Sequence, residues 1–171
     1  MPTQNDTFPL IIRAATRADL PALEWDGVYT HFRRLFQHAF EQTQRGEIGM
    51  YLAEVPGKGI VGQVFVQYDS LRPEMADGCT RAYVYSFRVK PAYRNRGIGT
   101  RLMQTVETDL KKRGFTRVTL NVARDNPDAR RLYERLGYRV VGSDPGHWSY
   151  LDHEGHRRFV SEPAWRMEKT L

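Results

Sequence analysis

The sequence contains a single cysteine, Cys79, among its 171 residues. An internal disulfide is therefore excluded, as is usual for proteins of the reducing cytoplasm. No apolar run approaches the roughly 20 residues that cross a bilayer. No basic segment followed by an apolar one opens the chain as a secretory signal would. We therefore expect a cytoplasmic protein without a membrane partner.

Two common nucleotide-binding loops are also missing. A Walker A loop needs Gly-x-x-x-x-Gly-Lys before Ser or Thr, and the chain has no such run. A dinucleotide-binding fingerprint needs a third glycine at the position where Leu102 stands. His153 and His156 form an H-x-x-H pair without further convincing ligands, so we predict no metal site.

The composition is that of a chain able to fold, with 40% hydrophobic and 12% aromatic residues. The length fits one domain, which we place at residues 10–171 after a short N-terminal extension at 1–9. The net charge of +6 is compatible with a basic soluble protein, a polyanionic cofactor or a nucleic acid partner. The chain has no recognisable nucleic-acid-binding motif, so we expect no nucleic acid partner.

The hydrophobic periodicity predicts an α+β fold. Ile98, Leu102, Val106 and Leu110 recur every fourth residue, as on one face of a helix. Residues 117–122 alternate apolar and polar side chains, as in a strand. The predicted helices cover 16–26, 28–45, 97–113 and 127–136. The predicted strands cover 10–14, 49–55, 59–68, 81–89, 117–122, 138–142, 147–151 and 164–169, with a loop at 69–80.

The stretch YRNRGIGTRL, at 93–102, is the first candidate site. It places Arg94, Arg96, Gly97 and Gly99 where the predicted strand ends and the next helix begins. Glycines let a ligand approach the backbone, and a helix start offers unpaired N–H groups and partial positive charge. Such a loop favours an anion, above all a phosphate. The simpler alternative is a helix start that needs a tight turn.

A second motif, NVARDNPDARRLYERLGYRVVG, follows at 121–142. Together the two motifs resemble the GCN5-related N-acetyltransferase (GNAT) superfamily. The family's acetyl-CoA loop, Gln/Arg-x-x-Gly-x-Gly/Ala, is matched by Arg94, Gly97 and Gly99, and its second motif by Asn126 and Tyr133. The close resemblance covers residues 82–142, and the layout of the whole chain from residue 10 fits.

The resemblance implies the GNAT fold, with α/β/α layers and a mixed, mostly antiparallel, twisted sheet of about six to seven strands flanked by about four helices. It implies acetyl-CoA as cosubstrate, an amine-bearing acceptor as partner, and a homodimer. Backbone N–H groups of the loop would hold the coenzyme A pyrophosphate, and the strand end beside a bulge would hold the pantetheine arm. The residues assigned to the cofactor are Phe87, Arg88, Val89, Arg94, Asn95, Arg96, Gly97, Ile98, Gly99, Thr100 and Asn126.

The implied mechanism is direct attack of an amine on the thioester, with Tyr133 as the general acid that protonates the departing thiolate. On periodicity alone, Tyr133 is a packed aromatic residue and Asn126 a helix cap. No acyl-enzyme on Cys79 is implied. Residues 81–85 have no glutamate where many relatives carry a general base. A non-catalytic acyl-CoA-binding sensor of the same fold is therefore the alternative.

The acceptor site is predicted from the segment EWDGVYTHF at 24–32. Trp25, Asp26 and Tyr29 would give an aromatic wall with a carboxylate, which suits a cationic amine, and ordinary helix packing is the equal alternative. The sequence leaves open which amine is acetylated, whether longer acyl groups are used, and which residue is the base. By position alone, the candidate bases are Glu24, Asp26, His31, His147, Asp152, His153 and His156.

Overall fold

The central element of the computed structural model is one seven-stranded sheet with the strand order β1-β2-β3-β4-β5-β9-β6. The structure describes residues 9–171, so the extension predicted at 1–9 lies almost wholly outside the described residues. β4 and β5 are parallel, and the other neighbouring strands are antiparallel. The mixed, mostly antiparallel sheet of the prediction is thus confirmed. Its strands are β1 (Ile11–Ala14), β2 (Ile48–Val55), β3 (Gly59–Gln67), β4 (Arg81–Val89), β5 (Arg117–Ala123), β6 (Arg139–Asp144) and β9 (Ala164–Thr170).

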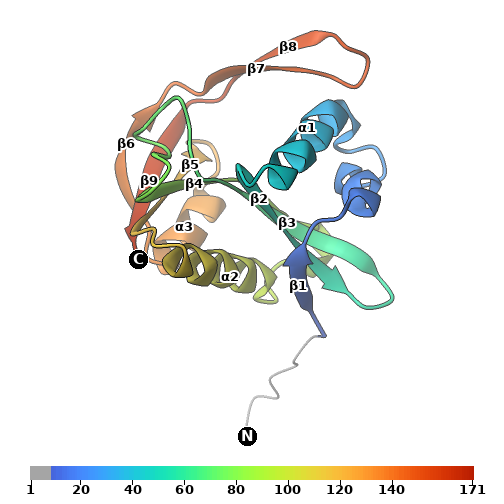
Figure 1. Ribbon diagram of the computed structural model, residues 1–171, viewed down its shortest axis with the longest axis horizontal. Coiled ribbons are helices and arrows are strands. Elements are labelled where there is room, and N and C mark those ends of the chain that lie inside the picture. Colours follow the sequence, from blue (N-terminus) through green and yellow to red (C-terminus); the bar gives the residue numbers. More distant parts are fainter. Residues whose placement is uncertain (1–8) are drawn as a thin grey trace, which may run out of the picture.

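Helices cover both faces of the sheet. The helical elements are η1 (Arg17–Glu24), η2 (Thr30–Phe32), α1 (Arg33–Gln44), η3 (Pro91–Tyr93), α2 (Ile98–Lys112) and α3 (Pro127–Arg135). Figure 1 shows α1 and η1 on one face, with α2 and α3 on the other. The predicted α/β/α layers are therefore confirmed.

The two N-terminal helices differ in type from the prediction. η1 is a 3-10 helix with Pro21 inside it, and proline has no N–H to donate to an α-helical turn. Trp25 and Asp26 then adopt left-handed backbone, with φ of 48° and 53°, which ends the helix. The helix predicted at 28–45 begins as the 3-10 turn η2 and becomes α-helical only at Arg33.

The sequence analysis missed one strand. β8 (Arg157–Ser161) pairs with β7 (His147–Leu151) in a separate two-stranded antiparallel sheet. The segment RRFVS has only two apolar residues, so its strand signal is weak. The β7–β8 hairpin projects from the main sheet toward the α1 side (Figure 1), where Trp148 and Tyr150 pack against Phe32. The hairpin thereby joins two regions that are far apart in the sequence.

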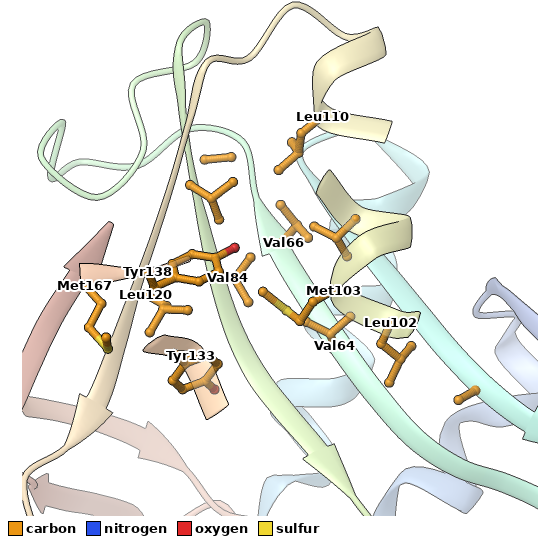
Figure 2. Close-up of a cluster of buried hydrophobic side chains, with 14 of the residues drawn as sticks. Val64, Val66, Val84, Leu102, Met103, Leu110, Leu120, Tyr133, Tyr138 and Met167 are labelled. Atoms are coloured by element: carbon orange, nitrogen blue, oxygen red, sulfur yellow. The ribbon is translucent and has the colours of Figure 1, made fainter. Parts of the chain in front are cut away.

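A separate apolar cluster fills each face of the sheet. On the α2 side, Leu102 and Met103 pack with residues of β3, β4 and β5, and Tyr133 of α3 belongs to the same cluster (Figure 2). On the α1 side, Phe36 and Phe40 pack with η1, β2 and β3. Fully burying one such side chain contributes about 1.5–3 kcal/mol. These clusters fix β3 and β4, the strands that carry the site described below.

Within residues 9–171, no helix combines the length and apolar character that a membrane crossing requires. The same part of the chain holds no group of three or more His, Cys, Asp or Glu side chains suited to a metal ion. Cys79 is free and exposed in the loop between β3 and β4.

Candidate active site

The site begins where β4 and β5 separate. The two strands pair only from Arg81 to Val84 of β4, opposite Arg117 to Leu120 of β5. Beyond this point β4 continues to Val89 beside β3, while β5 continues beside β9. Among residues 9–171, no strand therefore lies beside the β5-facing edge of residues 85–89. Free peptide groups at such an edge can pair with an extended, amide-bearing ligand.

A β-bulge shapes this open edge. The pairing of β3 with β4 shifts between Gln63 and Phe65, where β4 carries an additional residue, and Ser86 adopts a left-handed φ of 53°. Gln63 is fully buried, and its amide nitrogen lies 3.2 Å from both the carbonyl oxygen and Oγ of Ser86. The buried side chain of Gln63, in a mostly apolar strand, thus stabilises the bulge.

The start of α2 lies next to this edge. Gly97 is its N-cap with φ +78°, a conformation that favours glycine, and no side chain caps the helix. A Cβ added at Gly99 would lie 2.9 Å from Cζ of Phe87, so α2 approaches β4 closely here. The first N–H groups of a helix have no intrahelical acceptor. This end of α2 is therefore suited to bind an anion.

Arginines surround the helix start. Arg94 and Arg96 are exposed in the loop before α2, and Asn95 between them has a left-handed φ of 61°. Nε of Arg94 donates to the carbonyl oxygen of Val89 at 2.9 Å, and the guanidinium of Arg96 lies 5.8 Å from the ring of Tyr93. The loop therefore combines fixed backbone geometry with positive charge, as the sequence predicted for a phosphate site.

Tyr133 of α3 lies on the α2 side of the open edge. Its side chain is buried in the core cluster, and its ring centroid is 6.0 Å from that of Phe87. Burial raises the pKa of its hydroxyl, which therefore stays protonated at neutral pH. Within residues 9–171, no group forms a hydrogen bond with this hydroxyl. Tyr133 is thus a packed aromatic residue whose protonated hydroxyl has no hydrogen-bond partner in the described fold.

Asn126 stands at the start of α3. Its side-chain oxygen accepts a hydrogen bond of 3.1 Å from the backbone nitrogen of Ala129. This is the N-cap role that the Asn-Pro pair predicts, and Pro127 occupies the first helical position. A cofactor contact by Asn126 stays a prediction.

The opposite face of β4 borders a cleft of about 820 Å³. It lies between the η2–α1 region, the sheet surface at β4 and β5, the loop 69–80 and the first residues of β7. The loop is fixed in place because Oγ1 of Thr119 donates to the carbonyl oxygen of Met75 at 2.6 Å. Aromatic side chains dominate the cleft wall: Tyr29, Phe32, Phe36, Phe65, Tyr83, Tyr85 and Trp148. Ser86 also lines it, so the cleft reaches the bulge.

A second cavity, of about 880 Å³, lies between β1, β2 and α2. Its lining includes Tyr51, Asp109 and Arg113 but neither Ser86 nor Tyr133. It therefore does not border the open edge of β4.

The three predicted acceptor residues are placed differently from one another. Tyr29 lines the cleft. Trp25 packs behind it, edge to face, with 5.1 Å between the ring centroids. Asp26 is exposed on the turn before Tyr29 and is not among the cleft-lining residues. Only Tyr29 is thus in a position to contact a molecule in this cleft.

The candidate bases divide in the same way. His31 and His147 line the cleft. Glu24 instead pairs with Arg33 at 2.9 Å and is not among the cleft-lining residues. Asp152 accepts hydrogen bonds from the backbone nitrogens of Glu154 and His156 in the β7–β8 turn, and His153 and His156 belong to that turn. The turn residues therefore have a structural setting outside the cleft.

The sequence analysis did not single out two polar residues of the cleft floor, Asn121 and Asp144. Asn121 of β5 directly follows the last residue paired with β4, and its Oδ1 is buried without a hydrogen-bond partner. Asp144 of β6 is buried, and it accepts from Arg72 at 2.6 Å and from the nitrogen of Gly146 at 2.8 Å. Burial opposes ionisation, but these hydrogen bonds prevail and lower the pKa of Asp144. No local motif marks either residue, because three segments distant in sequence bring them together.

A family model agrees with this geometry. The model described as Acetyltransferase (GNAT) family matches residues 15–138, which contain the bulge, the helix start and Tyr133. The chain belongs to the GNAT family. As a member, it is an acyltransferase that uses acetyl-CoA, as the sequence motifs predicted.

Solved structures similar to this GNAT chain share its fold over nearly the full length. Ard1 from Thermoplasma volcanium is 18% identical, with a TM-score of 0.72, and the match covers 95% of this chain and 98% of that one. NAA60 from Arabidopsis thaliana in complex with acetyl-CoA is 21% identical, with a TM-score of 0.72 and the same two coverages. A spermidine N-acetyltransferase chimera from Vibrio cholerae and hSSAT is 18% identical, with a TM-score of 0.69 and 95% of each chain covered.

Proposed function

We propose that this protein transfers the acetyl group of acetyl-CoA to an amine bound in the aromatic cleft, with Tyr133 as the general acid. The observation that carries the proposal is the separation of β4 from β5 at Val84. The opening lies between the cleft on one face and Tyr133 on the other. An acyl donor bound along the open edge of β4 would be accessible from both sides.

The residues around this opening fit acetyl-CoA. The N–H groups of Ile98, Gly99 and Thr100, together with the charges of Arg94 and Arg96, suit a pyrophosphate. The β5-facing edge of Phe87, Arg88 and Val89 suits the amides of a pantetheine arm, with the Val89 carbonyl already accepting from Arg94. Acetyl-CoA supplies the thioester carbon that the amine attacks.

The protein's own groups then handle protons. The neutral amine forms a bond to the acyl carbon, the carbon–sulfur bond breaks, and the sulfur leaves as a thiolate that takes a proton. The buried, protonated hydroxyl of Tyr133 supplies that proton. The amine loses one proton in the same reaction, and His31 and His147 are the candidate bases that line the cleft. One proton is gained by the base and one is lost by Tyr133, and exchange with solvent returns both groups to their starting state.

Calorimetric titration with acetyl-CoA, with ATP and NADH as controls, tests the cofactor assignment. We expect acetyl-CoA to bind selectively. Release of free coenzyme A thiol on addition of a mixed pool of amines then tests transfer. Binding without acetylation of any amine would favour the non-catalytic sensor instead.

The cytoplasmic location, the single domain at 10–171 and the homodimer stay predictions. Light scattering on a size-exclusion column would measure the mass in solution. A mass near twice the 19.9 kDa of the chain is the expected result, and 19.9 kDa would contradict the dimer.

A further inference from the structure

Arg88 is a cationic side chain that faces the cleft without a carboxylate partner. It follows the bulge in β4, and its guanidinium lies 3.9 Å from the ring centroid of Tyr29. Phe32 and Phe36 are also close, at 5.7 Å and 5.8 Å. Among residues 9–171, no Asp or Glu oxygen lies within 4.0 Å of it, and its buried Nε has no hydrogen-bond partner.

Such a setting favours a bound anion. Burial removes water from the guanidinium and lowers its pKa. Cation–π contact with Tyr29 offsets only part of this cost. A carboxylate would restore charge-assisted hydrogen bonds in the planar geometry that guanidinium prefers. The guanidinium of Arg88, which lines the cleft, is therefore a recognition element for an acidic group.

The position of Arg88 limits how far that acidic group is from the reacting amine. Nη2 of Arg88 donates to Oγ of Ser86 at 2.9 Å. Ser86 is the bulge residue at the open edge, where the proposed function delivers the acetyl group. A carboxylate on Arg88 would thus lie close to the amine, as in an α- or β-amino acid.

The rest of the cleft supplies complementary contacts. Asn121 of β5 also lines the cleft, and its amide side chain can pair with a polar group of the acceptor. The aromatic wall can hold an apolar side chain. The β7–β8 hairpin covers one side, since Trp148 and Tyr150 pack on Phe32 and Gly155 in its turn lies beside Arg34. This cover favours a small acceptor over a folded protein surface.

We propose that the acceptor is a small amino acid with a free carboxylate and an apolar or aromatic side chain. Arg88 would bind its carboxylate. The inference rests on the proposed function, because it takes the cleft as the acceptor site. Arg88 would then determine specificity through its side chain, while its backbone stays available to the cofactor.

The test compares two ligands that differ only in the carboxylate. N-acetyl-L-phenylalanine and N-acetylphenethylamine are titrated by calorimetry into the full chain saturated with coenzyme A. We expect the carboxylate ligand to bind about tenfold more tightly or better. Arg88→Met should reduce this ratio to about one. The matched control Arg33→Met, an exposed arginine outside the cleft, should keep the ratio.

Several results would overturn the inference. Equal binding of the two ligands by the unchanged chain would do so, as would the absence of binding. An equal loss for both ligands in Arg88→Met would assign Arg88 to packing or to the acyl group instead. The titration needs no turnover, so its result is independent of whether transfer occurs. Conversely, equal turnover of L-phenylalanine and phenethylamine would refute the inference while confirming transfer to amines.

Discussion

The two sides of β4 are built on different principles. On the α2 side, the proposed cofactor site consists mainly of backbone: a helix start, two glycines and an unpaired strand edge. On the α1 side, the proposed acceptor site consists of side chains from η2, α1, β4, β5, β6, β7 and the loop 69–80. The first arrangement suits a cofactor that is the same whichever acceptor is used. The second can change its specificity by single substitutions without altering the fold.

This contrast predicts that a substitution in the backbone of the proposed cofactor site has the largest effect on ligand affinity. Gly97→Val should lower acetyl-CoA affinity by about 100-fold or more, because a β-branched residue disfavours φ +78° and would occupy the open space where the proposed ligand lies. Gly57→Val is the matched control, since Gly57 also has a positive φ, 80°, and open space around it. Calorimetry with acetyl-CoA measures both. Equal affinities in the two variants would contradict the loop assignment.

Tyr133→Phe should have the next largest effect, on turnover alone. Loss of the proton donor should lower kcat by about 100-fold, with acetyl-CoA affinity unchanged because the ring is kept. Tyr138→Phe is the control, a neighbouring buried tyrosine whose hydroxyl donates to Glu107 at 3.1 Å. Steady-state kinetics would measure both variants, and full activity of Tyr133→Phe would remove its hydroxyl from the mechanism.

The pH profile adds an independent test of Tyr133. Because burial raises its pKa above the ordinary value near 10, the acid form persists through the neutral range. The rate should therefore rise with pH as the acceptor amine deprotonates. It should not fall through loss of the Tyr133 proton below about pH 10. A falling limb near neutral pH that disappears in Tyr133→Phe would contradict this.

Gln63→Leu should have a smaller effect, but on both the proposed cofactor site and the proposed acceptor site. Its amide stabilises the bulge that the two sites share. Removing its donor from Ser86 should lower kcat by about tenfold and the free energy of unfolding by about 1 kcal/mol. Gln104→Leu, on the exposed face of α2, should change neither quantity. A lower free energy of unfolding with an unchanged kcat would assign Gln63 to folding alone. A lower kcat with an unchanged free energy of unfolding would assign it to positioning alone.

The smallest effect is expected in the hairpin. Asp152 has its pKa lowered from 3.8 to about 2, first by the backbone N–H of His156 and also by Arg158. A lowered folded-state pKa stabilises the hairpin above about pH 4, and this contribution is lost as pH falls toward 2. The protection factors of β7–β8 amides, corrected for the intrinsic exchange rate at each pH, should therefore fall on acidification. Asp152→Asn should show the low protection already at pH 6, whereas Asp125→Asn, an exposed control, should not.

The sequence predicted most of the helices and strands because these depend on local signals, whereas the sheet and its layers were expected from the resemblance to the GNAT family. Glycine spacing, the Asn-Pro cap and the fourfold apolar repeat of α2 each lie within one segment. It failed at η1, where Pro21 favours a 3-10 helix, and at β8, whose pairing with β7 rather than its own periodicity makes it a strand.

The proposed acceptor cleft was hardest to predict, because its residues come from several distant segments. Tyr29 was identified because it lies in an aromatic segment. Asn121 and Asp144 were not, since their chemistry arises only when β5, β6 and the loop 69–80 meet. The side chain of Arg88 faces the cleft because the bulge at Ser86 changes the alternation of β4. Strand periodicity alone does not reveal that register.

The open edge of β4 also bears on how the protein would respond to its surroundings. In the proposed binding mode, the helix start and the strand edge contact the nucleotide and the pantetheine arm, which the reaction leaves unchanged. The spent carrier, free coenzyme A, keeps all of these contacts and would compete with acetyl-CoA for the same place. The rate would then follow the ratio of acetylated to free carrier rather than the amount of either, so that the enzyme slows when acetyl units become scarce.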